Sequence, residues 1–221
     1  MKHASSPDEI RRRLLRTIAA APVVLAAPRL LGLVACADAA TGSTGGADTT
    51  GGTALNPTLA CVDDDDVDPT QAETEGPYFT PNSPERTSLL ESGLGGTVLV
   101  VSGLVLTRSC QPVAGALVDF WQADDDGQYD NAGYRMRGHQ FTDATGAYRL
   151  ETVVPGLYPG RTRHIHVKVQ APGQSILTTQ LFFPGESGNA SDGIFDTSLL
   201  MQMSDTAAGK AGQFNFVLDM A

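Results

Sequence analysis

The stretch TVLVVSGLVL at positions 97–106 is apolar and rich in β-branched residues, with small residues interrupting it, and it predicts a strand. Comparable runs follow along the chain: GALVDFWQA (115–123), GAYRLETVV (146–154), RHIHVKVQA (163–171), TTQLFF (178–183) and FNFVLDM (214–220). Helical periodicity of 3.6 residues is weak between these runs. The strands are therefore expected to pair with one another without intervening helices.

The segments between the runs are rich in turn-forming residues. They read DDDG (124–127), TDATG (142–146), VPGLYPG (154–160), APGQ (171–174) and PGESGN (184–189). Short connections of this kind are typical of all-β folds and argue against a parallel α/β sheet. We predict an all-β domain, a β-sandwich of mixed or antiparallel strands with few short helices, one of them near residues 197–203.

Composition excludes some classes of partner. The 221 residues include 24 Gly and 13 Pro, which suits one domain of strands and turns. The formal net charge of −10 argues against a nucleic-acid partner, because phosphate binding requires Lys and Arg. No uninterrupted apolar run is long enough to span a bilayer.

Residues 1–35 are interpreted as an export signal and not as part of the fold. The segment RRRLLR (11–16) resembles the twin-arginine export pattern, and LVAC (33–36) resembles a bacterial lipobox. In a lipobox the cysteine is lipidated, so Cys36 would carry the protein's one membrane anchor. The alternative is a plain cleaved signal with a coincidental cysteine. Both readings predict an exported protein, periplasmic or at the cell surface.

Residues 36–57 are small and of low complexity, which is typical of a flexible tether, and residues 58–221 form the expected domain. Beyond the leader two cysteines remain, Cys61 and Cys110. A pair of cysteines in an oxidising compartment is more often bridged than free. Our hypothesis is a Cys61–Cys110 disulfide that pins the start of the domain to its sheet.

The segment RTRHIHVKV (161–169) holds two of the four histidines of the chain. In a strand, residues i and i+2 point to the same face, so His164 and His166 project side by side while Ile165 points the other way. Two adjacent imidazoles are hard to explain as packing, because each would need a polar partner when buried. The pair alone is moderate evidence for a metal site.

Further ligands would have to be oxygen donors, because no free cysteine is expected in the mature domain and a Cys-rich zinc site is therefore disfavoured. Tyr129, Tyr134 and Tyr158 are the candidates near the pair. A tyrosine beside a turn is most often a packed ring with a wet hydroxyl. However, Tyr158 lies in a Pro-Gly turn that leads back to the histidines, and phenolate is a hard anionic donor that suits Fe(III).

These motifs together resemble a known family. The segments TEGPYF (74–79), PVAGALVDFWQADDDGQYD (112–130), TDATGAYRLETVVPGLYPGRTRHIHVKV (142–169) and APGQSILTTQLFF (171–183) are similar to the intradiol ring-cleaving dioxygenases, the catechol and protocatechuate dioxygenases and their exported relatives. The resemblance covers about residues 60 to 220. A Tyr eight residues after Trp121, an Arg three before the histidine pair and the LTTQ segment are together specific.

The resemblance implies a ligand set for ferric iron. Tyr129 matches the family's equatorial tyrosinate, and Tyr158 matches the axial tyrosinate, which leaves the iron when substrate chelates. His164 and His166 match the two histidine ligands. The cofactor implied is Fe(III), held by all four side chains.

The resemblance also implies substrate-binding and catalytic residues. Arg161 matches the arginine that faces the bound catecholate and stabilises negative charge developing on the ring. Gln180 matches the glutamine beside the open coordination side. Pro77 and Tyr78 match the segment that lines the substrate mouth. Tyr158, once released, and Arg161 and Gln180 would be the catalytic groups.

The activity implied is cleavage of a catechol-type diol by O2 between the two hydroxylated carbons, which yields a muconic acid. The loop from Tyr158 to His164 is shorter than in well-known catabolic members, and Gly160 falls near a position where some of them carry an aromatic residue, so the site should be more open. We expect the mature chain to lack the helical segment through which catechol dioxygenases dimerise. The sequence does not decide the oligomeric state, and a homodimer is one of the alternatives. Tyr134 and His139 match no ligand and are expected to be structural.

Two other classes compete with this reading. A non-catalytic, lipid-anchored β-sandwich binding module would explain PVAGALV (112–118) and TDATGAYRL (142–150), but it gives no reason for the histidines, tyrosines and Arg161 together. A zinc or copper protein, acting as a hydrolase or metal binder, is disfavoured by two phenolates and by the lack of a general-base carboxylate at convincing spacing.

Overall fold

The computed structural model describes residues 67–221. These residues lie in one of two compact units of the chain, Thr53–Ala221. The predicted export signal, the lipidated Cys36, the tether and Cys61 lie outside the described residues. Cys110 is disulfide-bonded, and its pairing with Cys61 stays a prediction.

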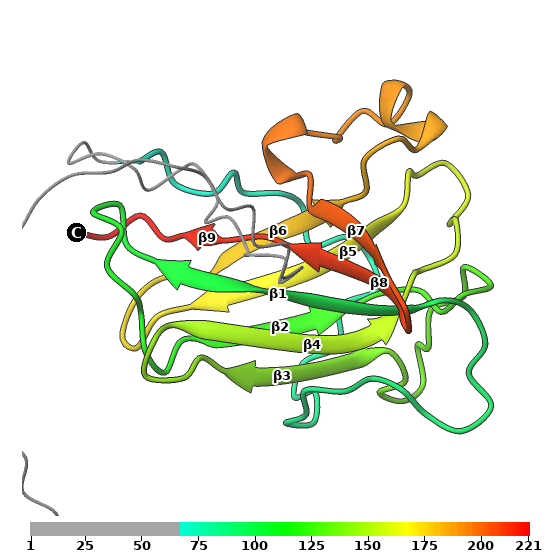
Figure 1. The fold of residues 1–221 in the computed structure, drawn as a ribbon, viewed down its shortest axis with the longest axis horizontal. Helices are drawn as coiled ribbons and strands as arrows, with labels where there is room; N and C mark the ends of the chain where they lie inside the picture. Colours follow the sequence, from blue (N-terminus) through cyan, green and yellow to red (C-terminus); the bar gives the residue numbers. More distant parts are fainter. Residues whose placement is uncertain (1–66) are drawn as a thin grey trace, which may run out of the picture. The chain divides into compact units, whose positions relative to one another are not determined.

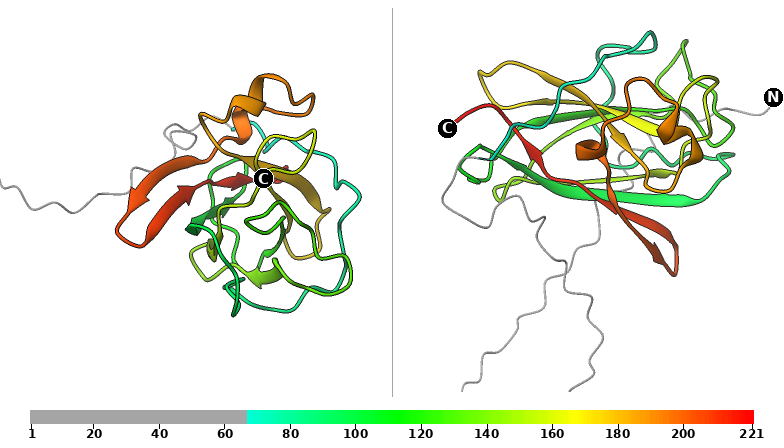
Figure 2. Two further views of the ribbon diagram at one scale, coloured as in Figure 1. Left: turned by 90° about the vertical axis from the view of Figure 1, so that its right-hand side faces the viewer. Right: turned by 90° about the horizontal axis from the view of Figure 1, so that it is seen from above.

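Two β-sheets pack face to face and form a sandwich (Figures 1 and 2). The first sheet has the order β4-β1-β8-β7, with β9 also paired to β1, and the second has the order β3-β2-β5-β6. The strands are β1 (Val98–Leu106), β2 (Leu117–Trp121), β3 (Arg137–Phe141), β4 (Ala147–Val153), β5 (His164–Gln170), β6 (Leu177–Phe182), β7 (Gln202–Thr206), β8 (Gly209–Gln213) and β9 (Phe216–Val217).

Pairing within the sheets is mixed. Strand β1 runs antiparallel to β4 and parallel to β8 and β9, whereas all pairs of the second sheet are antiparallel. Two 3₁₀ helices, η2 (Ser187–Ala190) and η3 (Thr197–Leu199), follow β6. The predicted β-sandwich with few short helices is therefore confirmed, and η3 begins where a short helix was expected but ends four residues earlier than residue 203.

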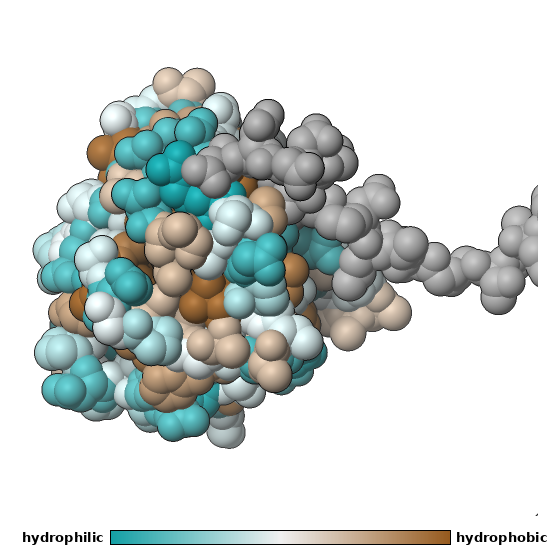
Figure 3. All heavy atoms as spheres, turned by 90° about the vertical axis from the view of Figure 1, so that its left-hand side faces the viewer, coloured by the Kyte–Doolittle hydropathy of each residue, from teal (hydrophilic) through white to brown (hydrophobic). Residues whose placement is uncertain are grey.

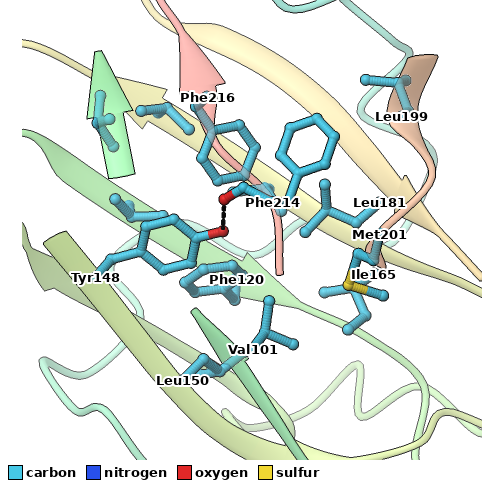
Figure 4. Close-up of a cluster of buried hydrophobic side chains, with 14 of the residues drawn as sticks. Val101, Phe120, Tyr148, Leu150, Ile165, Leu181, Leu199, Met201, Phe214 and Phe216 are labelled. Atoms are coloured by element: carbon cyan, nitrogen blue, oxygen red, sulfur yellow. Dashed lines mark hydrogen bonds between the residues drawn. The ribbon is translucent and has the colours of Figure 1, made fainter. Parts of the chain in front are cut away.

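Alternation of apolar side chains explains why the predicted runs became strands. Leu99, Val101 and Val105 of β1 are fully buried, as are Ile165 and Val167 of β5, because their side chains face the other sheet. The core between the sheets is lined by aromatic and aliphatic side chains from both, including Phe120, Tyr148, Leu181 and Phe216 (Figure 4). The Tyr148 hydroxyl donates a hydrogen bond of 2.8 Å to the Phe214 carbonyl within this core.

Some elements were not predicted. Strand β3 was missed because its sequence, RGHQF, has a buried arginine where an apolar residue would be expected. The β7–β8 hairpin was also missed, because β7 is mostly polar and exposed and β8, GKAGQ, has no large apolar side chain. It projects beyond the sandwich in both views of Figure 2. Backbone hydrogen bonds to β1 hold this hairpin, and they leave no apolar pattern in the sequence.

The segment before β1 crosses the outer face of the second sheet. The Glu73 amide bonds to the Thr178 carbonyl, and the Gln180 amide side chain donates to the Thr74 carbonyl at 3.0 Å. Farther along, Ser83 donates to Asp119 of β2 at 2.8 Å. The outward-facing side of β5, which carries His164 and His166, is therefore covered by this segment and not by solvent alone.

At the left-hand end of the sandwich in Figure 1, hydrophilic and hydrophobic side chains are mixed on the surface. Figure 3 views the left-hand side of Figure 1, where hydrophobic side chains occur in small groups among hydrophilic ones. Among residues 67–221 no helix is long and apolar enough to cross a membrane.

Candidate active site

His164 and His166 stand side by side at the start of β5, as the strand period predicted. Their ring centroids lie 4.8 Å apart with the planes nearly perpendicular at 85°, and only 5% and 3% of the two residues is exposed. Burial lowers the pKa of His164 to about 4 and holds the pKa of His166 well below its usual value. Both imidazoles are therefore neutral, which is the form that binds metals.

The tautomer of His164 follows from its neighbours. Its Nδ1 lies 2.6 Å from the carbonyl oxygen of Thr162, which can only accept, so Nδ1 carries the proton. The lone pair of Nε2 then faces the Tyr129 hydroxyl at 3.2 Å, which donates to it. A histidine whose Nδ1–H is held by a backbone carbonyl presents Nε2 as a donor of fixed direction.

Three tyrosines surround the histidine pair. The rings of Tyr78 and Tyr129 stack with centroids 4.6 Å apart, and Tyr158 meets both rings edge-on. The hydroxyls of Tyr78 and Tyr158 are 2.6 Å apart and hydrogen-bonded. Burial raises the pKa of Tyr129 well above its usual value although Arg161 and Arg137 act to lower it, so without a metal ion this phenol keeps its proton.

The loops after β2 and β4 bring Tyr129 and Tyr158 to the start of β5, at the right-hand end of Figure 1. Asp124 fixes the first turn, because one carboxylate oxygen accepts from the amides of Asp126 and Gln128. The same turn meets the Tyr158 loop through a bond of 2.7 Å from the Gly156 amide to the Asp124 carbonyl.

The buried guanidinium of Arg137 ties two parts of the site together. It donates to the Tyr78 carbonyl at 2.6 Å and to the Asp130 carbonyl at 2.7 Å, next to Tyr129. Only 1% of Arg137 is exposed, so these bonds satisfy a charge that would otherwise be costly to bury. Sequence reasoning missed this residue because its partners are backbone carbonyls, one of them from a segment 59 residues away, and these leave no side-chain motif.

His166 is fixed by packing. Trp121, its direct neighbour in β2, lies flat on its ring with centroids 4.8 Å apart and an interplanar angle of 7°. On the other side a Cβ at Gly76 would lie 3.3 Å from Cε1 of His166, and Gly76 has a φ of +71°. Only glycine adopts that backbone conformation without strain and passes so close to the imidazole.

Arg161 is held by two partners. Its Nε donates to the Asp192 carboxylate at 2.8 Å, and Nη2 donates to the Gln180 side-chain oxygen at 2.7 Å. Within residues 67–221, Nη1 forms no hydrogen bond and stays available to a ligand. The positive charge of Arg161 also acts on the site, because it contributes to lowering the pKa values of His164 and His166 after burial, the larger cause.

The structure thus places the sequence-derived residues together. Gln180 is fully buried and pairs directly with His166 in the sheet, so both side chains share a face. Pro77 is exposed beside Tyr78 at the rim.

Tyr134 and His139 lie apart from the donors. The Tyr134 hydroxyl bonds to the Pro81 carbonyl, and Nδ1 of His139 lies 3.1 Å from the Ser83 hydroxyl.

The donor set fits a hard trivalent metal better than zinc. Among residues 67–221 no group of three or more His, Cys, Asp or Glu side chains could hold a metal. Both neutral imidazoles have the Tyr129 phenol as a near neighbour, and Tyr158 meets the Tyr129 ring edge-on. Nδ1 of His166 is buried with no hydrogen-bond partner in this part of the chain. Two imidazoles with two phenols, Tyr129 and Tyr158, suit Fe(III) by charge and donor hardness.

Fold and site together define a β-sandwich protein with a mixed histidine–tyrosine donor site at one end of its second sheet. A family model described as "Dioxygenase" matches residues 74–220, more than half of the chain. The chain therefore belongs to the intradiol dioxygenase family, as the sequence motifs predicted.

Individual relatives agree with this assignment. The chain is 58% identical, with a TM-score of 0.68, to the dioxygenase domain of a dioxygenase–carbohydrate-binding protein fusion from Streptomyces sp. SirexAA-E. The match covers 70% of this chain and 100% of that domain. It is 28% identical, with a TM-score of 0.65, to 3-chlorocatechol 1,2-dioxygenase from Rhodococcus opacus 1CP, over 69% of this chain and 73% of that one.

Among curated relatives, hydroxyquinol 1,2-dioxygenase of Nocardioides simplex is 30% identical over 162 residues, 62% of this chain and 55% of the relative. The chain spans about half the length of the hydroxyquinol dioxygenases it matches.

Proposed function

We propose that this protein is an intradiol dioxygenase that uses ferric iron to cleave a catechol-type diol with O2, giving a muconic acid-type product. The observation that carries the proposal is the convergence of two neutral imidazoles and two phenols beside Arg161. Relatives named as 1,2-dioxygenases of hydroxyquinol and chlorocatechol support the reaction class.

Tyr129, Tyr158, His164 and His166 would hold the iron. When bound, ferric iron supplies a Lewis acid that lowers the pKa of coordinated hydroxyl groups and brings substrate and O2 together. Burial raises the pKa of Tyr129 in the protein alone, and a bound cation would act in the opposite direction, because it favours the charged form of a buried phenol.

The chain's own residues would orient the diol and handle its protons. The hydroxyls of Tyr158 and Tyr78, 2.6 Å apart, can hold a proton between them at the mouth of the site. Arg161 would face the bound diol with a guanidinium whose position is fixed on two sides by Asp192 and Gln180. Fixed positive charge stabilises negative charge that develops on the substrate, because it does not have to reorganise during reaction.

The rim supports a substituted catechol as the substrate class. Leu157, next to Tyr158, is 57% exposed, and no atom lies within 4 Å of the position that a Cβ at Gly160 would occupy. Both positions neighbour Tyr158 in the sequence, and we propose that they leave room for a ring substituent. We therefore expect catechols substituted away from the two hydroxyls to be accepted.

The iron-loaded protein should consume one O2 for each catechol and release an acyclic diacid that contains both oxygen atoms of that O2. An oxygen electrode and mass spectrometry of the product made under ¹⁸O2 measure this. Hydroquinone, whose hydroxyls cannot chelate one metal, is the matched control and should not react. A product that retains its ring, or equal reaction of hydroquinone, would contradict the proposal.

The non-catalytic binding module finds less support, because it gives no reason for the donor side chains to meet at one point.

We propose in addition that the protein is exported and held at the membrane by a lipid on Cys36. The support is the sequence of the leader, RRRLLR (11–16) and LVAC (33–36), which lies outside the described residues.

A further inference from the structure

The loop after β6 packs against the segment that carries Arg161, and nothing in the sequence motifs pointed to it. Residues 184–196 include η2 and contact Arg161 and Thr162 through side-chain hydrogen bonds. A Cβ at Gly188 would lie 3.1 Å from the Thr162 side chain, so the two segments are in close contact. A small polar pocket remains between them, lined by Gly160 and Arg161 on one side and Ser191 and Asp192 on the other.

Asp192 is the residue of this loop that reaches Arg161. Its Oδ2 accepts hydrogen bonds from Arg161 Nε at 2.8 Å and from the Thr162 amide at 2.9 Å, and Oδ1 accepts from the Ile194 amide at 3.2 Å. Only 3% of the Asp192 side chain is exposed, against 20% for Arg161. Although burial opposes it, the hydrogen bonds from Thr162 and Arg161 hold the pKa of Asp192 below its usual value, so the carboxylate is charged.

This contact determines how Arg161 can point. With Nε bound to Asp192 and Nη2 bound to Gln180, the planar guanidinium is fixed in orientation, and Nη1 is left for the ligand. Gln180 is in turn held by its bond to the Thr74 carbonyl. Without Asp192 one of the two protein partners of Arg161 would be lost, and the side chain could rotate about its remaining contact.

The same loop supports the ligand histidine. Thr162 Oγ1 donates to Asn189 Oδ1 at 2.6 Å, and Asn189 Nδ2 donates to the Phe183 carbonyl at 2.9 Å. The Thr162 carbonyl is the group that holds Nδ1 of His164. The loop therefore fixes Thr162, which lies between Arg161 and His164, through both its backbone amide and its side chain.

A neighbouring ion pair on the same loop provides a comparison. Glu186 accepts from Arg163 Nε at 2.8 Å, but both side chains are partly exposed, at 25% and 21%. Surface pairs of this kind contribute little to stability. Arg163 also bonds to the Pro155 carbonyl, and within residues 67–221 its side chain forms no hydrogen bond with the four donor side chains. The Glu186 pair therefore shares the loop with Asp192 but not its link to the site.

We propose that Asp192 is a positioning residue for the reaction, which acts through Arg161 by fixing its guanidinium beside the bound diol. This inference rests on the proposed function, because the arginine has a catalytic role only if a diol is cleaved at the site. The loop after β6, which contains none of the motif residues, would then position the guanidinium of Arg161.

The test is a double-mutant cycle on the iron-loaded protein. Asp192→Ala should lower kcat by about 100-fold, the effect of a misplaced catalytic group, with a smaller change in KM. Asp192→Asn, which keeps the size and a hydrogen-bond acceptor, should recover part of that loss. In the Arg161→Ala background, Asp192→Ala should cost less than about twofold more. Equal fold-losses in both backgrounds would overturn the proposal, because Asp192 would then act without Arg161.

A second readout does not depend on turnover. Modification of Arg161 by phenylglyoxal, followed by peptide mass spectrometry, should be about tenfold faster in Asp192→Ala, because one hydrogen bond to a charged group is lost. Glu186→Gln is the control and should change Arg163 modification only, with kcat unchanged. An unchanged Arg161 rate in Asp192→Ala would overturn the pairing. If wild-type protein cleaved no catechol, the proposed function would fail, and this measurement would still decide whether Asp192 holds Arg161.

Discussion

Replacing His166 with alanine is expected to give a folded protein that purifies with less than about one tenth of the wild-type iron. Three side chains would remain from the proposed four, and the neutral imidazole that packs between Trp121 and Gly76 would be gone. Ring cleavage should fall in proportion to the iron, because the chemistry depends on the metal. Metal analysis and oxygen uptake on the same sample measure both effects.

His139→Ala is the matched control for this experiment. His139 lies in β3, where its ring contacts Phe141 and Ser83, and in the described part of the chain it forms no hydrogen bond or ring contact with a proposed ligand. This variant should keep wild-type iron content. Circular dichroism and thermal melting show whether each variant is folded. Full iron and full turnover in folded His166→Ala protein would mean that His166 is not a ligand.

The second large effect is expected at Arg161. Arg161→Ala should keep its iron, because the four proposed ligands are intact, but kcat should fall by about 100-fold to 1000-fold, the range for removing one preorganised electrostatic group. Arg161→Lys should recover little, because an ammonium cannot contact Asp192 and Gln180 in the same fixed plane. Steady-state kinetics with catechol, together with anaerobic catechol titration, separate binding from turnover.

Arg149→Ala provides the control, since the Arg149 side chain is half exposed on the other sheet and forms a surface ion pair with Glu151. Its kcat should be unchanged. If Arg161→Ala turned over catechol at the wild-type rate, the electrostatic role of Arg161 would be wrong, and the proposal for Asp192 would lose its basis.

Local patterns were enough to predict the sandwich. Burial alternates along the first half of β1, and β5 alternates polar residues with Ile165 and Val167, which face the core. His164 and His166 share the other face of β5 because they are two residues apart. Strand β3 could not be predicted in this way, because Arg137 is buried through bonds to the Asp130 carbonyl of the preceding loop and to the Tyr78 carbonyl of a segment distant in sequence. A periodicity argument cannot anticipate hydrogen bonds made across the fold.

The same distinction holds for the site. The proposed ligands and Arg161 came from motifs that are compact in sequence, and the structure brings them together. Asp192 comes from a loop with no recognisable motif, and it enters the site only because the turn after β6 folds back onto Arg161 and Thr162. The stacking of Tyr78 on Tyr129 likewise depends on the path of the segment before β1.

The most direct test of the proposed ferric site is the visible spectrum of the aerobically purified protein, with iron quantified in the same sample, before and after anaerobic addition of catechol. We expect about one iron per chain, a broad visible band from tyrosinate–Fe(III) charge transfer, and a shift of that band to longer wavelength with catechol. Tyr158→Phe should weaken the band while the iron remains. A colourless protein that binds no iron after reconstitution would contradict the assignment of Tyr129, Tyr158, His164 and His166 as ligands.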